Sequence, residues 1–248
     1  DAQYGVKKNI TEILSENGFV TGCITSDEIT GATPASFYAH RKDRSEKNGM
    51  VKDLLNSKLS LFVGGGALSF NMLELQEKFY LCDDINELEN SRKERVGHFI
   101  SEKDVPSVDL RGNILSKATS KGINFLNNKQ KPFFLMVEGA QIDWYGHENQ
   151  FPKLIKEVID FDLAIGEAIK FADQNKNTLV LITADHETSG LSILSGNLDN
   201  NTLEGSFATH DHTGMMVPVF AYGPYSQNFQ GVYNNYDLFH KIIALVLK

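Results

Sequence analysis

The amino-acid sequence predicts an α/β protein with a mainly parallel central sheet sandwiched by helices. Two continuously apolar segments, at 132–137 and 177–183, and the amphipathic helical pattern between them, at 154–172, lead to this prediction. Strands that are apolar on both faces are typical of parallel sheets that helices cover on both sides. The length of 248 residues is ordinary for one such domain. Because no linker, repeat or low-complexity tract interrupts the pattern, we expect a single domain over residues 1–248.

The remaining elements follow from hydrophobic periodicity and from turn residues. Apolar residues from Val6 to Leu14 recur at helical spacing, and we expect this helix to end at Gly18, a typical C-cap. Residues 71–107 show a weaker and more charged pattern, which predicts irregular connections. The other predicted elements are strands at 19–25, 59–66 and 215–223 and helices at 35–40, 114–126 and 237–247.

Composition restricts the class of function. The formal net charge of −8 argues against a nucleic-acid-binding surface and favours binding of cations where acidic residues converge. No apolar stretch approaches the length of a membrane span, and the polar start "DAQYG" does not look like a secretory leader. Cys23 and Cys82 are too few for a disulfide framework, and we expect two buried free thiols.

Acidic and histidine side chains collect where the apolar strands end. In doubly wound sheets, ligands bind at the carboxyl ends of the strands. The first apolar strand is followed by Glu138, Asp143 and His147, the second by Asp185 and His186, and His210, Asp211 and His212 precede the strand at 215–223. Single clusters of this kind are more often hydrogen-bonded turns or solvated helix faces. Three of them beside strands favour a metal site. For His40, His98 and His240 we expect packing roles.

The types and spacing of these residues indicate the metal. Asp143 and His147 are four residues apart, so on a helical turn they share one face and could hold one ion. Asp185 and His186 are adjacent, so they need either separate roles or a bent strand end. Carboxylate and imidazole ligands without thiolate suit a catalytic zinc site. Carboxylate with hydroxyl ligands suits magnesium.

Four segments resemble the alkaline phosphatase family in order and spacing over nearly the whole chain. They are "ITGATPASFYAHRKDR", "FFLMVEGAQIDWYGH", "TLVLITADHETSG" and "THDHTGMMVPVFAYGP". The resemblance implies a mixed but mainly parallel sheet between helices and a metal-dependent phosphomonoester hydrolase of broad specificity. It further implies a phosphomonoester or inorganic phosphate as ligand and a periplasmic or secreted location. Members of the family are often dimers, so the resemblance also points to a homodimer.

The resemblance also implies the residues of the site. They would be Asp143, His147 and His212 for a first zinc, Asp185 and His186 for a second zinc, and Thr33 and Glu138 for magnesium. Arg44 would hold two phosphate oxygens with its planar guanidinium group. Without the resemblance, Arg44 would be interpreted as a solvated residue of the charged run "HRKDR".

Several positions depart from the family pattern. Gly31 replaces an acid or a histidine, Trp144 replaces a histidine or lysine near the phosphate, and Thr188 stands where some members carry a further histidine. We expect these changes to alter the surroundings of the metals and the magnesium affinity, and not the type of reaction.

Two residues that the family's reaction requires have no counterpart in the sequence. These are a metal-bridging Asp and the nucleophilic Ser of an Asp-Ser-Ala segment, both of which precede the matching region in the family. We therefore expect a member without its amino-terminal portion, inactive or nearly so by itself, that binds one divalent ion well. The alternatives are another hydrolase of the superfamily, such as a phosphodiesterase, sulfatase or phosphate mutase, and a non-catalytic protein that binds metal or phosphate.

Overall fold

The computed structural model describes residues 6–247, so the polar start of the chain lies outside the described residues. The chain forms two compact units. The first extends to Gly139, and the second is Ala140–Val246. The single domain expected over residues 1–248 stays a prediction.

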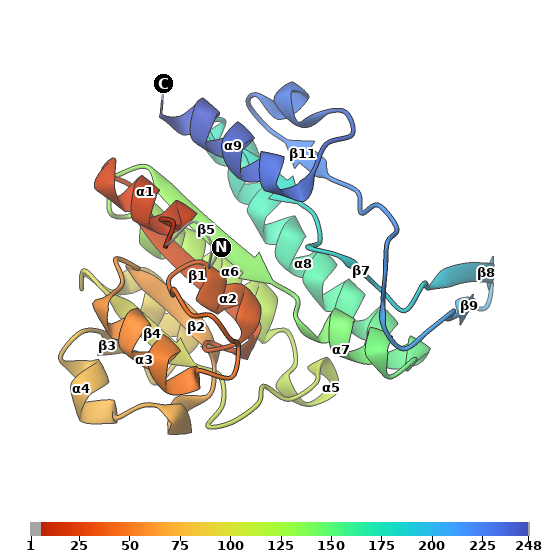
Figure 1. Ribbon diagram of the computed structural model, residues 1–248, viewed down its shortest axis with the longest axis horizontal. Helices are drawn as coiled ribbons and strands as arrows, with labels where there is room; N and C mark the ends of the chain where they lie inside the picture. Colours follow the sequence, from red (N-terminus) through yellow and green to blue (C-terminus); the bar gives the residue numbers. More distant parts are fainter. Residues whose placement is uncertain (1–5, 248) are drawn as a thin grey trace. The chain divides into compact units, whose positions relative to one another are not determined.

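The first unit is built on a five-stranded sheet with the order β3-β4-β2-β1-β5 (Figure 1). All neighbouring strands in it are parallel. This confirms the predicted α/β class with a mainly parallel sheet. The strands are β1 (Val20–Glu28), β2 (Leu61–Gly65), β3 (Tyr80–Leu81), β4 (Val96–Phe99) and β5 (Phe133–Glu138).

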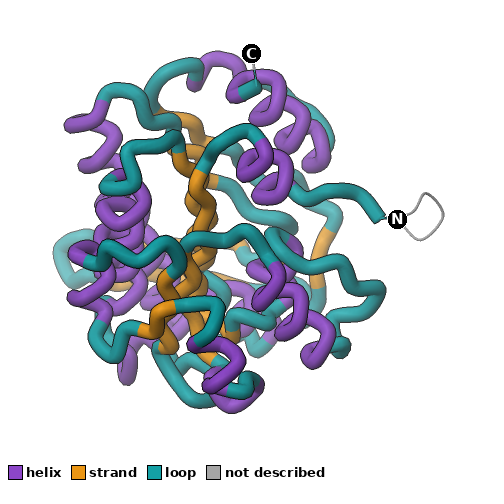
Figure 2. The backbone as a smooth tube through the Cα atoms, turned by 90° about the vertical axis from the view of Figure 1, so that its left-hand side faces the viewer, coloured by secondary structure: helices purple, strands orange, loops and turns teal. Residues whose placement is uncertain are grey.

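Helices pack on both faces of this sheet, and Figure 2 shows the strands in orange between helices. On one face, Ile24 and Leu61 meet the long helix α6 at Gly122, where an added Cβ would lie 2.8 Å and 2.9 Å from them. On the other face, Cys23 and Phe62 belong to a buried cluster that includes residues of α2 and α3. The helical segments of this unit are α1 (Ile10–Glu16), α2 (Ala32–Ser36), α3 (Lys47–Asn56), η1 (Ala67–Ser69), α4 (Met72–Gln76), η2 (Ile85–Asn90), α5 (Val108–Arg111) and α6 (Ile114–Asn127).

Some predicted boundaries were wrong. Helix α1 starts at Ile10 because Asn9 and Glu12 form a capping box, and it ends where Gly18 takes a φ of 87°. The helix expected at 35–40 is α2, whose first turn already contains Pro34, a position that proline tolerates. Residues 71–107 are not irregular: they contain β3 and β4 as well as two helical segments. These elements have two to six residues, too few to show a period.

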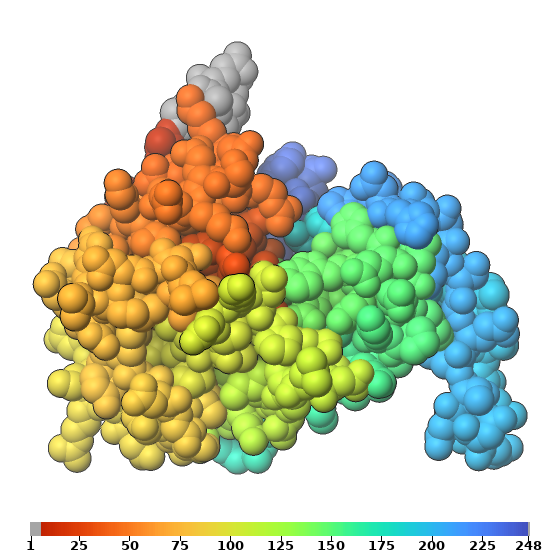
Figure 3. All heavy atoms as spheres, turned by 90° about the horizontal axis from the view of Figure 1, so that it is seen from below, coloured from red at the N-terminus to blue at the C-terminus, as the bar shows by residue number. Residues whose placement is uncertain are grey.

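The second unit contains two longer helices and three small antiparallel ladders: β6 with β11, β7 with β10, and β8 with β9. The strand expected at 215–223 is reduced to β11, which pairs antiparallel with β6. Figure 3 shows the β8–β9 hairpin, in light blue, standing out from the rest of this unit. The elements are α7 (Gln141–His147), α8 (Phe151–Asn175), β6 (Val180–Ile182), β7 (Glu187–Thr188), β8 (Ser192–Asn197), β9 (Thr202–Ser206), β10 (His212–Thr213), β11 (Phe220–Tyr222), η3 (Ser226–Phe229) and α9 (Asn235–Val246).

The prediction of two buried free thiols is confirmed. Cys23 and Cys82 are free and buried. Among residues 6–247, no helix has the length and apolar character that crossing a bilayer requires. The three histidines assigned to packing have structural contacts: His40 with Glu12, His98 with the Cys82 carbonyl, and His240 with Phe239.

Arg95, just before β4, connects the end of α3 to the sheet through hydrogen bonds. Its guanidinium group donates to the Leu59 carbonyl at 2.9 Å, to the Leu54 and Leu55 carbonyls at 3.3 Å, and packs 3.9 Å over the Phe79 ring. Burial lowers the pKa of Arg95 to about 10. The Leu54 carbonyl also accepts from the backbone N–H and the hydroxyl of Ser57, whereas Arg95 is the donor to the Leu55 and Leu59 carbonyls.

The substitution Arg95→Met should lower the free energy of unfolding by about 2–3 kcal/mol, because the Leu55 and Leu59 carbonyls lose their donor in a partly buried position. Urea denaturation of the two proteins measures this difference. The matched control Arg92→Met, at an exposed arginine three positions earlier, should change it by less than about 0.5 kcal/mol. Equal effects at both positions would contradict the role given to Arg95.

Candidate metal centre

A carboxylate and two imidazoles converge in the second unit. Helix α7 carries Asp143 and His147 one turn apart, with Asp143 Oδ1 3.5 Å from His147 Nε2. Strand β10 adds His212, whose Nε2 lies 3.1 Å from His147 Nε2 and 3.7 Å from Asp143 Oδ1. Throughout the part of the chain that the structure describes, this is the one group of three or more potential ligands that could hold a single ion.

The spacing of these three atoms fits a tetrahedral ion. Metal–ligand bonds of about 2.0–2.1 Å at tetrahedral angles place two ligand atoms about 3.4 Å apart. The three observed separations, 3.1, 3.5 and 3.7 Å, scatter around this value. Two nitrogens and one oxygen therefore form one face of a tetrahedron, as in catalytic zinc sites that keep a fourth position for water or substrate.

Backbone carbonyls orient the histidine on α7. The His147 Nδ1–H donates to the His210 carbonyl at 2.6 Å, and the His210 Nδ1–H donates to the His147 carbonyl at 2.8 Å. The first bond fixes the proton of the His147 ring on Nδ1 and leaves Nε2 to face the site. His210 and Asp211 lie outside the ligand group, to which the resemblance had assigned only His212 of this segment. His210 instead supports the group, a role that the sequence did not indicate.

Asp185 and His186 follow β6 at a bend in the backbone. The bend brings Asp185 Oδ2 within 3.4 Å of His186 Nε2, again close to a tetrahedral edge. From the sequence, these adjacent side chains needed either separate roles or a bent strand end. In the structure the backbone bends after β6, and the two side chains lie together. The His186 ring stacks on that of His212 with centroids 3.6 Å apart and planes at 23°.

The turn after β7 is held by a carboxylate. Glu187 accepts hydrogen bonds from the Gly190 N–H at 2.8 Å and from the Thr213 hydroxyl. Gly190 has a φ of 61°, a conformation that glycine adopts without strain. This arrangement closes the short ladder in which Thr188 of β7 pairs with His212 of β10.

Glu138 ends strand β5 in the first unit. It pairs in register with Thr25 of β1, whose fully buried hydroxyl donates to Glu138 Oε2 at 2.5 Å. The Thr25 oxygen in turn accepts the Asp27 N–H at 2.9 Å. Sequence reasoning missed Thr25, because nothing in one sequence gives the register of two strands 113 residues apart.

Thr33 and Arg44 lie on the segment after β1. Thr33 is in the first turn of α2, a helix that packs on β1 and β5. Arg44 is exposed in the loop before α3, whereas the nearby Arg41 is bound to Asp53. The structure therefore leaves the Arg44 guanidinium exposed on this loop.

A carboxylate occupies the space beside Gly31. A Cβ at this position would lie 2.3 Å from Asp27 Oδ2, so the glycine allows Asp27 to sit there. Burial raises the pKa of the Asp27 carboxyl, while the Glu28 N–H, which donates to it at 2.6 Å, opposes this. The departure noted at Gly31 thus makes room for an acid from another position, which sequence reasoning had not found.

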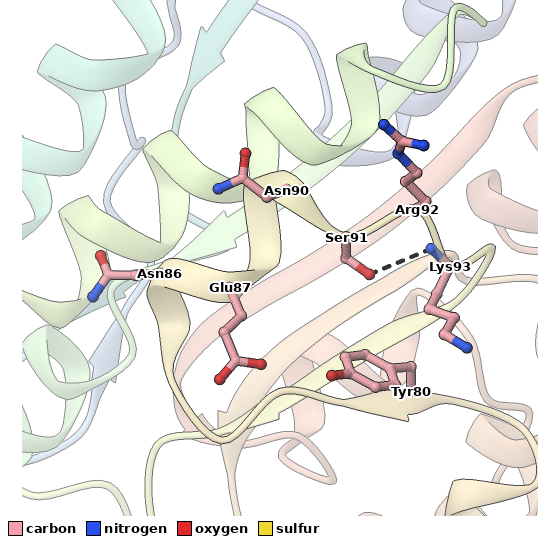
Figure 4. Close-up of a pocket in the computed structure, with 7 residues that line it drawn as sticks. All are labelled: Tyr80, Asn86, Glu87, Asn90, Ser91, Arg92 and Lys93. Carbon is pink, nitrogen blue, oxygen red and sulfur yellow. Dashed lines mark hydrogen bonds between the residues drawn. The ribbon is translucent and has the colours of Figure 1, made fainter.

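A separate hollow lies in the first unit between β3, η2 and the loop before β4 (Figure 4). It has a volume of about 800 Å³ and is lined by Tyr80, Glu87, Arg92 and Lys93 together with small polar residues. These charged side chains are exposed, and the hollow contains one carboxylate, Glu87. It does not have the ligand density of the centre in the second unit.

The fold and the centre define a class of protein: an α/β protein with a mixed carboxylate–imidazole site of the kind that metal-dependent hydrolases use. Comparison with known proteins gives the family. Residues 102–205 match the sequence profile of the alkaline phosphatase family. Alkaline phosphatase 3 of Bacillus subtilis (strain 168) is 29% identical, over 93% of this chain and 69% of its own length. Alkaline phosphatase of Escherichia coli (strain K12) is 28% identical, over 95% and 66%.

Solved structures agree with the sequence matches. Alkaline phosphatase from the Antarctic bacterium TAB5 superimposes with a TM-score of 0.89 at 37% identity, over 96% of this chain and 75% of that one. A variant of the same enzyme with bound Mg gives 0.91 at 36%, over 99% and 77%. The chain belongs to the alkaline phosphatase family. It spans about two thirds of the length of the two curated relatives named above.

Zinc should stabilise the protein through the three-ligand centre. At a zinc concentration of about 100 times Kd, binding adds about 2.7 kcal/mol, which raises Tm by about 5–10 °C in a domain of this size. Thermal unfolding with zinc and with chelator measures the shift.

His147→Ala should remove most of this shift, whereas His240→Ala, at an exposed histidine near the end of the chain, should keep it. A Tm that zinc does not move, or one that moves equally in the His147 variant, would contradict the assignment of the centre.

Proposed function

We propose that residues 1–248 form the metal- and phosphate-binding part of an alkaline phosphatase, a phosphomonoester hydrolase of broad specificity. The observation that carries the proposal is the meeting of Asp143, His147 and His212 at separations that fit one tetrahedral ion. Membership of the family supports the same reaction class. The neighbour solved with bound Mg supports a metal-dependent reaction in the relative.

The proposed assignment gives each ligand set one ion. Asp143, His147 and His212 hold a first zinc, Asp185 and His186 contribute to a second zinc, and Glu138 and Thr33 contribute to magnesium. When bound, these ions supply positive charge that stabilises the charge developing on the phosphoryl group. Acidic ligands alone would repel a phosphate, so the ions must be present before the substrate approaches.

Arg44 is proposed to bind two equatorial phosphate oxygens. Its guanidinium group presents paired N–H donors in one plane, which match two oxygens of a phosphate, and it remains charged at any working pH. The exposure of Arg44 leaves these donors available. Because the contacts are to phosphate and not to the alcohol part, they favour a broad range of monoesters.

The proposal also covers the setting of the protein. A periplasmic or secreted location and a homodimer are carried over from the resemblance, and both stay predictions. Neither the proposed metal ligands nor Arg44 identifies the alcohol part of the physiological phosphomonoester.

Substitution of the arginine tests the phosphate assignment. In the zinc-loaded protein, Arg44→Ala should weaken binding of inorganic phosphate about 10- to 100-fold, the value of one or two charge-assisted hydrogen bonds. Isothermal titration calorimetry measures it. Lys42→Ala, at an exposed cation of the same loop, should change the affinity less than about threefold, since a lysine lacks the paired planar donors that bind two phosphate oxygens at once.

If both variants bind phosphate like the parent, Arg44 is a solvated residue. That result would favour the alternative functions, namely a phosphodiesterase, sulfatase or phosphate mutase.

Residues 1–248 by themselves should release no phosphate from p-nitrophenyl phosphate above the rate without protein, even with zinc and magnesium. The physical reason is that none of the serines in this sequence stands in an Asp-Ser-Ala segment, and covalent catalysis needs an activated nucleophile. Absorbance of nitrophenolate measures the rate. Metal-dependent release that His147→Ala abolishes would overturn this expectation and place the nucleophile within the 248 residues.

A further inference from the structure

We propose that Thr188 is a positioning residue that orients ligands of both zinc sites with a single hydroxyl group. It lies on β7 and is not a metal ligand in the proposed assignment. Its Oγ1 donates a hydrogen bond to Asp143 Oδ1 and lies 3.2 Å from His186 Nδ1. The inference rests on the proposed function, because it gives Asp143 to one zinc and His186 to the other.

The backbone around Thr188 explains why the hydroxyl reaches both groups. Thr188 pairs with His212 in the β7–β10 ladder, and its side chain points to α7 at Gly146. A Cβ at Gly146 would lie 3.0 Å from Thr188 Cγ2, so this glycine lets the threonine methyl rest directly on the helix. A β-branched side chain has few χ1 rotamers, and contact with the helix restricts it further.

The donor and acceptor roles follow from counting protons. A hydroxyl has one hydrogen, and an ionised carboxylate can only accept, so the hydrogen points to Asp143. The lone pairs of Thr188 Oγ1 are then left for His186, whose Nδ1 must carry the ring proton and donate it. The Nε2 of His186 is therefore unprotonated in the neutral ring. This nitrogen lies 3.4 Å from Asp185 Oδ2, the other ligand assigned to the second zinc.

The same hydroxyl constrains the first site. The oxygen that accepts its hydrogen, Asp143 Oδ1, is the one that faces His147 Nε2 at 3.5 Å and His212 Nε2 at 3.7 Å. A carboxylate oxygen has two lone pairs, so it can accept from Thr188 and still face an ion. Groups that hold metal ligands in this way are worth about 10- to 100-fold in metal affinity.

The Thr188 hydroxyl is not needed for the strand pairing, which the backbone makes. Substitutions can therefore separate a positioning role from a structural one. Thr188→Val keeps the shape and removes the hydroxyl, and Thr188→Ser keeps the hydroxyl and removes the methyl. Thr202→Val is the matched control, because it removes a hydroxyl from the separate β8–β9 hairpin of the same unit, where that hydroxyl bonds Asn200 and no proposed ligand.

The experiment measures zinc affinity by competition with a chromophoric chelator, and the His186 tautomer by 15N NMR of the metal-free protein. Thr188→Val should weaken zinc binding about 10- to 100-fold and shift the His186 ring from the Nδ1–H form to a mixture of tautomers. Thr188→Ser should restore both to within about threefold of the parent, since it keeps the donor. Thr202→Val should leave both measurements unchanged, since its hydroxyl contacts none of the proposed ligands.

The proposal is overturned if Thr188→Val keeps the parent zinc affinity and tautomer, if Thr202→Val weakens zinc binding equally, or if Thr188→Ser behaves like the valine variant. Failure of the proposed function is distinguishable from these outcomes. A parent protein that binds no zinc would refute the assignment of the metal centre. The tautomer of His186 in the metal-free protein would still test whether Thr188 sets it.

Discussion

The pairing of β7 with β10 is the interaction on which the metal centre depends. Helix α7 can place Asp143 and His147 on one face without help, but two ligands do not enclose an ion. His212 is 65 residues from His147 and reaches it only because a two-residue ladder returns the chain to α7. So short a ladder is weak by itself. The Glu187 carboxylate stabilises this ladder, because it accepts hydrogen bonds from the Gly190 N–H after β7 and from the Thr213 hydroxyl on β10.

Four of the seven proposed ligands are held by a second group, and backbone position fixes these groups. The His210 carbonyl holds His147, and the Thr188 hydroxyl contacts both Asp143 and His186. In the first unit, Thr25 holds Glu138 through the parallel pairing of β1 with β5. Because a rigid strand or turn supplies each partner, the ligands are oriented before an ion binds, and less conformational entropy is lost on binding.

Glycines set the close approaches in both units. Gly122 lets α6 lie directly on Ile24 and Leu61, and Gly146 lets Thr188 contact α7. Gly31 has a different effect, since the space of its missing side chain is filled by the Asp27 carboxylate. This arrangement also explains why Asp27 is partly buried at the end of β1.

The sequence by itself determined the α/β class, the parallel sheet, the helical pair Asp143 and His147, and the family resemblance that joined them to His212. These features are local patterns of hydrophobicity and spacing, or motifs of fixed order. Only the tertiary structure decided the bent end at Asp185 and His186, the support from His210, and the roles of Thr25, Thr188 and Asp27. Those depend on strand register and on contacts between segments far apart in the chain. Many registers satisfy the same hydrophobic pattern, and packing of the whole chain selects one of them.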